Sequence, residues 1–353
     1  MKMGASLSYF FDASSEKLMI EPSGLLNRIF TSSFSAIMKK KPRLFMRLYS
    51  IIGMYTYKLP DKNNIKLVST SHVPIPKGEK IVVYVHTPSR LLTIEYKEAL
   101  ELRRNGPFSI LYMTIWRSIY FFLYRRSLRR AMIIISNSQN TRNRLLKYIG
   151  VDSMVILPTV DVDKFSNKGY GDFFFYPSRI SSAKRQLYAL SAFKEFVKQK
   201  DGFKLILATT NLKSKENIQY LNIVKKFIKE NRLPVEIIEG ADFDKIADLY
   251  SRAYTCLFAG KDEDFGLVPL ESMASSKPII AVNEGGMPET ILDGVNGFLV
   301  NSEPEMTNRM IQLANDINMT KEMGESGRKY VKEKFIDEVF INRLKEIIES
   351  QVK

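Results

Sequence analysis

Residues 260–300, GKDEDFGLVPLESMASSKPIIAVNEGGMPETILDGVNGFLV, carry the pattern that decides the fold of the second half of the chain. An apolar loop lies between two glutamates, Glu263 and Glu271. Residues 278–282 have the composition of a buried strand. Gly285 and Gly286 then form a flexible turn before a second helix start. This order of loop, helix, strand and turn predicts a ligand-binding site in an α/β protein.

The loop itself is suited to an anionic or hydroxyl-bearing ligand. If a helix opens near Leu267, its free amides and positive end face the loop and form an anion site. Pro269 fits the first helical turn, and Gly266 allows close approach of the backbone. Glu263 and Glu271 can hold sugar hydroxyls by charge-assisted hydrogen bonds. The alternative is that these glutamates are solvated helix residues and the glycines simple turns, but the combination is more specific than any one residue.

The segment that begins at residue 263, EDFGLVPLESMASSKPIIAVNEGGMPETILDGVNGFLV, resembles the donor-site signature of the retaining GT4 glycosyltransferases. The resemblance is dense over residues 173–300, fair over 82–165 and weak before residue 80. Asp264 departs from it, because the family usually has glycine there. The resemblance implies an α/β protein of the GT-B fold, with two Rossmann-like domains whose parallel sheets face a cleft, and transfer of a sugar with retention.

Length and periodicity agree with two domains. A chain of 353 residues is too long for one typical core. Strands alternate with helices after residue 166, which predicts a parallel sheet covered on both faces. Residues 158–165, PTVDVDKF, look like the family's linker. We expect a basic, membrane-facing, acceptor-binding domain over 1–165, a nucleotide-sugar-binding domain over 166–335, and a helix over 336–353 that crosses back to the first domain.

Two cations follow the strand expected at residues 173–176, within SRISSAKRQ. Arg179 and Lys184 lie across a strand-to-helix turn, where long cations and helix amides together suit a diphosphate. The alternative, two surface cations, would be preferred for an isolated R-x4-K, and the strand context argues against it. In the resembled family, these positions bind the donor diphosphate and stabilise it as the leaving group.

The resemblance implies the other donor-site roles. Glu271 would hold the nucleotide ribose, and Glu263 would contact and orient the sugar. The remaining donor-binding residues would be Asp264, Phe265, Gly266, Leu267, Gly285 and Gly286. No cofactor and no metal are expected, because protein cations replace a divalent ion. The donor would be a GDP- or UDP-linked sugar.

His86 lies just beyond a strand expected at residues 81–85, in HTPSR. Open α/β sheets bind ligands at the carboxyl ends of their strands. The resemblance implies that His86 faces the transferred sugar or the acceptor, and the alternative is a structural histidine that caps a loop. The single cysteine, Cys256, excludes a disulfide framework and a cysteine metal cluster, so a cytoplasmic setting is the default. Asp12 interrupts the start before a long apolar core forms, so no signal peptide is predicted.

Basic charge is concentrated in the first part of the chain. Residues 1–150 hold 25 Lys+Arg against 8 Asp+Glu, and residues 151–353 hold 28 against 30, within a total net charge of +15. This asymmetry predicts an anionic partner, such as a membrane surface, a lipid-linked phosphate or nucleic acid. Nucleic acid is the weakest of the three, because no motif for its recognition accompanies the charge.

The apolar run at residues 108–124 is short for a membrane span, and a charge lies inside it. We therefore expect no transmembrane helix, but either an interfacial aromatic helix or a helix packed on the sheet with its arginines outward. A peripheral position on the inner face of the membrane follows. The residues expected to meet membrane or acceptor are Lys39, Lys40, Lys41, Arg117, Arg125, Arg126, Arg129 and Arg130.

The whole pattern, which includes the segments HTPSR, SNSQNTRNRL and SRISSAKRQ, resembles the mannosyltransferases of this family that use GDP-mannose. The expected function is transfer of a hexose, with mannose preferred, to a lipid-linked or glycan acceptor at the cytoplasmic membrane face. Two alternatives stay open. The chain could be a non-catalytic sugar-nucleotide-binding protein, or another GT-B enzyme such as a nucleotide-sugar epimerase.

Overall fold

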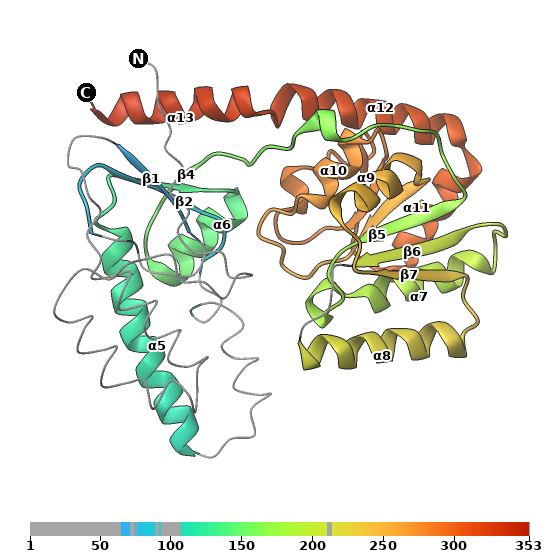
Figure 1. Ribbon diagram of the computed structural model, residues 1–353, viewed down its shortest axis with the longest axis horizontal. Coiled ribbons are helices and arrows are strands. Elements are labelled where there is room, and N and C mark those ends of the chain that lie inside the picture. Colours follow the sequence, from blue (N-terminus) through green and yellow to red (C-terminus); the bar gives the residue numbers. More distant parts are fainter. Residues whose placement is uncertain are drawn as a thin grey trace. The chain divides into compact units, whose positions relative to one another are not determined.

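The computed structural model describes residues 65–70, 75, 77–88, 92, 107–209 and 214–352 (Figure 1). These residues lie within one compact unit, Tyr57–Lys353. Lys39, Lys40 and Lys41, expected to meet a membrane, lie outside the described residues.

The first sheet has four parallel strands in the order β1-β2-β3-β4. Its strands are β1 (Lys66–Thr70), β2 (Ile81–Val85), β3 (Ile133–Ser136) and β4 (Met154–Val155). Every residue of β2 is buried, as its β-branched, apolar sequence predicts for a central parallel strand. The associated helices are α5 (Pro107–Leu128) and α6 (Gln139–Arg144). A π-helical turn, Leu145–Ile149, follows α6 directly and ends at Gly150 with φ +68°.

The second sheet has six parallel strands in the order β10-β9-β8-β5-β6-β7. Its strands are β5 (Phe173–Pro177), β6 (Lys204–Thr209), β7 (Val235–Glu239), β8 (Thr255–Phe258), β9 (Ile279–Val282) and β10 (Gly297–Val300). The chain order reverses between β5 and β8, because β5 pairs with both β6 and β8. Such a switch point is where open α/β sheets bind ligands, at the carboxyl ends of the strands.

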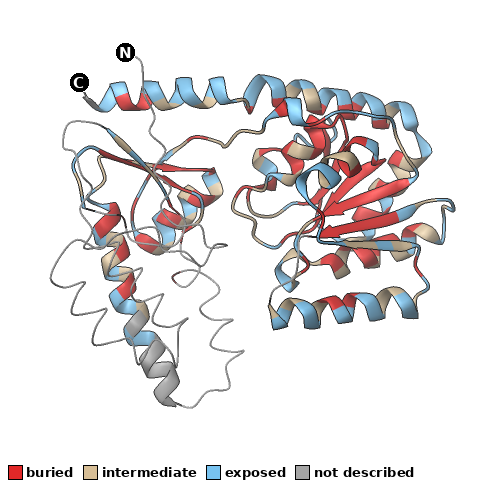
Figure 2. Ribbon diagram, in the orientation of Figure 1, coloured by how far each residue is buried: buried red, intermediate tan, exposed pale blue. Residues whose placement is uncertain are grey.

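Six helices connect the strands of the second sheet or follow them (Figure 1). They are α7 (Gln186–Val197), α8 (Lys215–Glu230), α9 (Phe243–Arg252), α10 (Val268–Ala274), α11 (Glu303–Asn315) and α12 (Ile317–Lys334). Side chains of Ser214, Asp242 and Ser302 cap three of them by accepting a backbone N–H, which explains where these helices begin. The strands β5, β8 and β9 are buried throughout, which matches their apolar sequences (Figure 2).

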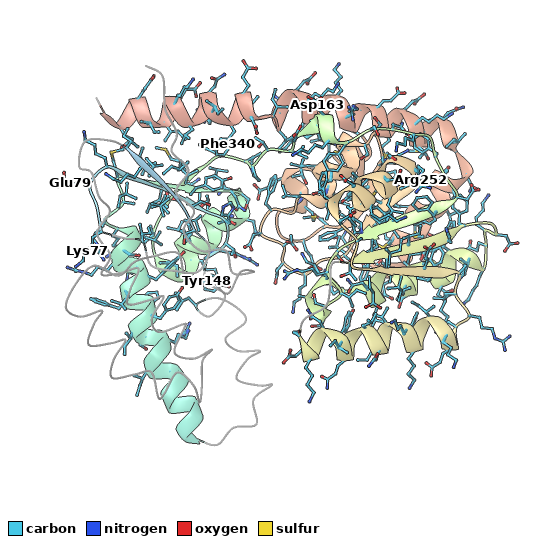
Figure 3. The ribbon with its side chains drawn as sticks, in the orientation of Figure 1. Lys77, Glu79, Tyr148, Asp163, Arg252 and Phe340 are labelled. Carbon is cyan, nitrogen blue, oxygen red and sulfur yellow. The ribbon has the colours of Figure 1, made fainter. Side chains whose placement is uncertain are left out.

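The last helix, α13 (Asp337–Val352), packs on the first sheet. Ile347 and Ile348 share a buried cluster with strand residues that include Val82 and Tyr84. Phe340, labelled in Figure 3, lies on α13, and its ring meets the Tyr84 ring edge-on with 5.6 Å between the centroids. A helix that follows the second sheet in sequence therefore completes the core of the first.

The architecture confirms the fold class expected from the sequence, an α/β protein with two parallel sheets. Strand positions agree closely with the sequence pattern, because short β-branched and aromatic runs bounded by turn residues favour buried strands. Within the described part of the chain, no helix has both the length and the apolarity to cross a membrane.

Candidate active site

A short 3-10 turn after β5, Ser182–Lys184, carries the predicted phosphate-binding lysine. The Tyr176 hydroxyl donates to the backbone oxygen of Lys184 at 2.5 Å and accepts from the backbone N–H of Ala259 at 2.8 Å. The N–H of Lys261 donates to the oxygen of Ala183 at 2.8 Å. Since Ala259 and Lys261 follow β8, these bonds attach the lysine turn to the neighbouring strand end across the switch point.

Lys184 and Glu263, both singled out from the sequence, meet in the structure. Lys184 Nζ lies 2.5 Å from Glu263 Oε2, and only 19% and 21% of the two side chains are exposed. The ammonium also lies 5.2 Å from the centroid of the Phe258 ring. Arg179 is exposed just after β5, the strand that leads into the Lys184 turn, and within the described residues its side chain makes no ion pair. One predicted cation is thus held against a carboxylate, and the other faces solvent.

Gly285 and Gly286 pack directly on the Glu263 loop. The N–H of Gly286 donates to the oxygen of Glu263 at 2.8 Å. A Cβ at Gly285, where φ is +61°, would lie 2.3 Å from that same oxygen, and one at Gly286 would lie 2.6 Å from the oxygen of Asp264. Both positions therefore require glycine, because any side chain would push the two loops apart.

The prediction that a helix opens after Gly286 is wrong. The structure has only one 3-10 turn there, Met287–Glu289, because the chain must return to β10 soon afterwards. Thr290 Oγ1 closes this turn by donating to the oxygen of Met287. The turn has too few aligned peptides to act as a helix N-terminus, so the second helix tip imagined from the sequence does not exist.

Glu271 lies on α10, which opens at Val268 with Pro269 in its first turn. The Tyr250 hydroxyl donates to Glu271 Oε2 at 2.7 Å. Burial raises the pKa of the Glu271 carboxyl, and the hydrogen bond from Tyr250 opposes that rise. Before the helix, Leu267 is 47% exposed, so its side chain can meet a ligand.

Phe265 and Gly266, two other expected donor residues, differ in what they offer. Phe265 is 3% exposed and packs in the core, which leaves only its backbone for a ligand. Gly266 has φ +85°, a left-handed conformation that favours glycine, and a Cβ there would press on the Met287 side chain.

Side chains of α6 reach the same loop. Arg144 Nη1 lies 2.6 Å from Asp264 Oδ1, and 13% of each side chain is exposed. Asn140 Nδ2 donates to the oxygen of Glu263 at 3.0 Å. The carboxylate of Glu289 accepts from the backbone N–H groups of Gln139 and Asn140, at 2.6 and 2.8 Å, so it caps the start of α6. Asp264, which departs from the resembled pattern, thus has a matching cation.

His86 lies at the carboxyl end of β2, where it is exposed. Its Nε2 lies 2.7 Å from Ser69 Oγ, and its ring meets the Tyr84 ring edge-on at 5.0 Å. Desolvation lowers the pKa of His86 below its ordinary value, which favours the neutral imidazole. No contact among the described residues joins His86 to the Lys184–Glu263 pair.

The family described as "Glycosyl transferases group 1" matches residues 161–330, the region that holds the Lys184–Glu263 pair and Glu271. The chain belongs to this family. It is a GT4 glycosyltransferase with the GT-B fold, and enzymes of this kind take their sugar from a nucleotide sugar.

Three relatives illustrate this glycosyltransferase's similarities. An uncharacterized glycosyltransferase of Methanocaldococcus jannaschii is 26% identical over 266 residues, 74% of this chain and 69% of that protein. The alpha-1,3/1,6-mannosyltransferase ALG2 of Dictyostelium discoideum is 32% identical over 193 residues, 50% of this chain and 46% of that protein. The crystal structure of Anabaena HepE in complex with UDP and glucose has a TM-score of 0.59 at 16% identity and covers 81% of this chain and 100% of HepE, which shows the shared fold. The match with the Dictyostelium ALG2 thus covers less than half of that protein.

The glycosyltransferase also holds the arginines expected to meet a membrane or acceptor, all on or just after α5. Arg126, Arg129 and Arg130 are exposed, and Arg117 is half-buried. Arg125 is half-buried as well, with its guanidinium 5.8 Å from the centroid of the Phe121 ring. The outward position expected of these arginines holds for three of the five.

Proposed function

We propose that this glycosyltransferase moves a hexose, with mannose preferred, from a GDP- or UDP-linked donor to a lipid-linked or glycan acceptor at the cytoplasmic face of a membrane. The observation that carries the donor half of the proposal is the contact between Lys184 Nζ and Glu263 Oε2 at 2.5 Å, at the sheet's switch point. A sugar diphosphate has an anionic diphosphate at one end and a sugar rich in hydroxyl groups at the other. Lys184 offers a cation to the diphosphate, and Glu263 offers a carboxylate to the hydroxyl groups.

In the proposed reaction, Lys184 and Arg179 neutralise the diphosphate as its bond to the sugar's anomeric carbon breaks. Glu263 accepts hydrogen bonds from the sugar hydroxyls and orients the ring. The acceptor oxygen forms the new bond to the anomeric carbon, and its proton passes to a departing phosphate oxygen. Glu271, held by Tyr250, accepts hydrogen bonds from the ribose. His86 contacts the sugar or the acceptor as a neutral hydrogen-bonding group.

The sugar preference draws on two different similarities. The ALG2 name supports mannose, and the HepE complex supports a uridine nucleotide. No described side chain near the strand ends distinguishes guanine from uracil, so both donors enter the test.

The membrane half of the proposal draws on charge and on α5. Residues 1–150 carry the whole basic excess of the chain. On α5, Ile115, Ile119 and Phe122 are 51%, 45% and 60% exposed, and their spacing places them on one face of the helix. Arg126 and Arg129 are exposed nearby. Exposed apolar and basic side chains together favour an anionic bilayer surface.

The purified protein would be incubated with GDP-mannose, UDP-glucose or UDP-N-acetylglucosamine and a lipid extract, and products followed by mass spectrometry. A lipid or glycan that gains one hexose from GDP-mannose supports the proposal. Donor turnover without any glycosylated product, or an epimerised donor, contradicts it.

Binding to liposomes that contain anionic lipid tests the membrane step separately. Arg126→Glu/Arg129→Glu should weaken sedimentation with the liposomes. Lys225→Glu/Lys226→Glu on α8 makes the same change of charge as a control. Equal binding by the two double variants contradicts the role of α5.

A further inference from the structure

Arg185, the residue after Lys184, has a backbone conformation that residues with a side chain rarely adopt. Its φ and ψ are +47° and +46°, between the lysine turn and α7. The left-handed region brings Cβ close to the following carbonyl, so such a conformation persists only where other contacts hold it.

Those contacts come from the Arg185 guanidinium. Nε donates to the backbone oxygen of Ala259 at 2.6 Å. Nη1 and Nη2 donate to Glu284 Oε1 and Oε2 at 3.1 and 2.9 Å. The guanidinium thus uses three N–H groups on two partners, and the fork with Glu284 fixes orientation as well as distance.

Arg185 and its two partners follow three adjacent strands. Arg185 follows β5, Ala259 follows β8, and Glu284 follows β9, immediately before Gly285. These strands are neighbours in the sheet. A single side chain therefore joins the lysine turn on one side of the Glu263 loop to the glycine turn on the other.

We infer that Arg185, together with Glu284, is a positioning residue for the phosphate end of the donor site. It holds Lys184 and the Gly285 turn in the relative placement that the leaving diphosphate requires. The inference rests on the proposed function, in which Lys184 neutralises that leaving group. Arg185 itself is occupied by Ala259 and Glu284, so it acts through its neighbours.

Two substitutions separate positioning from stability. Arg185→Gly and Arg185→Ala both remove the guanidinium, but only glycine adopts the left-handed backbone without strain. Both should lower kcat by roughly 10- to 100-fold, the scale expected when a reacting group is displaced by about 1 Å. The donor KM should change less than about threefold, since the ribose contact at Glu271 is untouched. Arg185→Gly should melt at a higher temperature than Arg185→Ala.

The partner supplies the next test. Arg185→Lys keeps the charge without the fork, and it should restore little activity. Glu284→Ala should lower kcat as Arg185→Ala does, and the double variant should be no worse than either single one. Arg142 and Asp152 form a matched control: their guanidinium–carboxylate fork has N–O distances of 2.7 and 3.0 Å, and neither residue belongs to the Lys184 turn or the Gly285 turn. Arg142→Ala should leave kcat unchanged.

A wild-type kcat in Arg185→Gly would overturn the inference. A kcat that is higher in Arg185→Gly than in Arg185→Ala, in parallel with the melting temperature, would also overturn it, because the loss would then come from stability. Calorimetry with UDP and with GDP gives a reading that needs no transfer, since these products carry the charge that the leaving group develops. Weaker binding of both by folded Arg185→Gly supports the inference, and unchanged binding overturns it. A wild type that transfers no sugar contradicts the proposed function alone.

Discussion

The carboxyl ends of the two sheets are built differently. At the second sheet, charged side chains already hold one another: Lys184 holds Glu263, and Arg185 holds Glu284. At the first sheet, His86 is exposed, and its one side-chain hydrogen bond among the described residues joins Nε2 to Ser69 Oγ. The proposed donor edge is therefore organised before any ligand binds, whereas His86 at the edge of the first sheet is held by a single described hydrogen bond and stays exposed to a ligand.

This difference has an energetic consequence. A half-buried ion pair gains little net stability, because desolvation offsets much of the attraction. Pairs such as Lys184–Glu263 are then better explained by function, since they fix side chains where a charged ligand arrives. Four sets of variants test this contrast between the two edges, and their effects decrease in the order given.

The first concerns the lysine at the donor edge. Lys184→Ala should lower kcat about 100- to 1000-fold, the usual effect of removing one group that stabilises transition-state charge. Lys198→Ala removes an exposed lysine that pairs with Glu195, and it should leave kcat unchanged. Steady-state transfer assays measure both. Near-normal turnover in Lys184→Ala would refute the prebuilt donor site.

The second concerns the ribose contact and its pH dependence. Burial raises the pKa of Glu271, so its carboxylate becomes protonated at a higher pH than an exposed one. The donor KM should rise as pH falls through that pKa. Tyr250→Phe removes the bond that lowers the pKa, so the rise should begin at higher pH and reach about tenfold. Tyr254→Phe, whose hydroxyl bonds the oxygen of Leu313, is the control. Identical pH profiles for the wild type and Tyr250→Phe would contradict this assignment.

The third concerns the first sheet. His86→Ala should lower kcat about tenfold, the scale of one hydrogen bond to a reacting group. Because desolvation lowers its pKa, the wild-type rate should stay level as pH falls through the ordinary histidine range. Ser69→Ala should have a smaller effect. A larger loss in His86→Ala than in Lys184→Ala would reverse the contrast between the two edges.

The fourth concerns the contact between α6 and the donor loop. Arg144→Ala leaves the Asp264 carboxylate without its cation beside the diphosphate, and the donor KM should rise about threefold to tenfold. Adding Asp264→Gly should restore the KM, because the repelling charge is then gone. The double variant is thus the control for the single one, and failure of the restoration would exclude charge as the cause.

Much of the fold could be predicted from local sequence. Short β-branched and aromatic runs such as IVVYV and FFFYP favour buried strands over helices, and their alternation with helices predicts parallel sheets. The helix expected after Gly286 failed because a Pro at the first turn starts a helix but does not set its length. That length depends on where β10 begins.

The site could be predicted only in part. Lys184 and Glu263 carry local signals, a cation after a strand and a glutamate before a glycine loop. The partners Arg185, Glu284 and Tyr250 gave no such signal, because each acts through contact with a residue far away in sequence. Arg185 and Glu284 are 99 positions apart, and Arg144 and Asp264 are 120 apart. Only the lysine-arginine doublet at 184–185 hinted that a second cation lies at the turn.

The packing of α13 on the first sheet has a consequence for how the chain folds as it is made. Ile347 and Ile348 belong to the same buried cluster as Val82. The strands of both sheets precede these isoleucines in sequence and are therefore synthesised first. Part of the apolar surface of the first sheet stays uncovered until the second sheet has been synthesised and α13 follows it. Folding of the early region is thereby tied to completion of the late one.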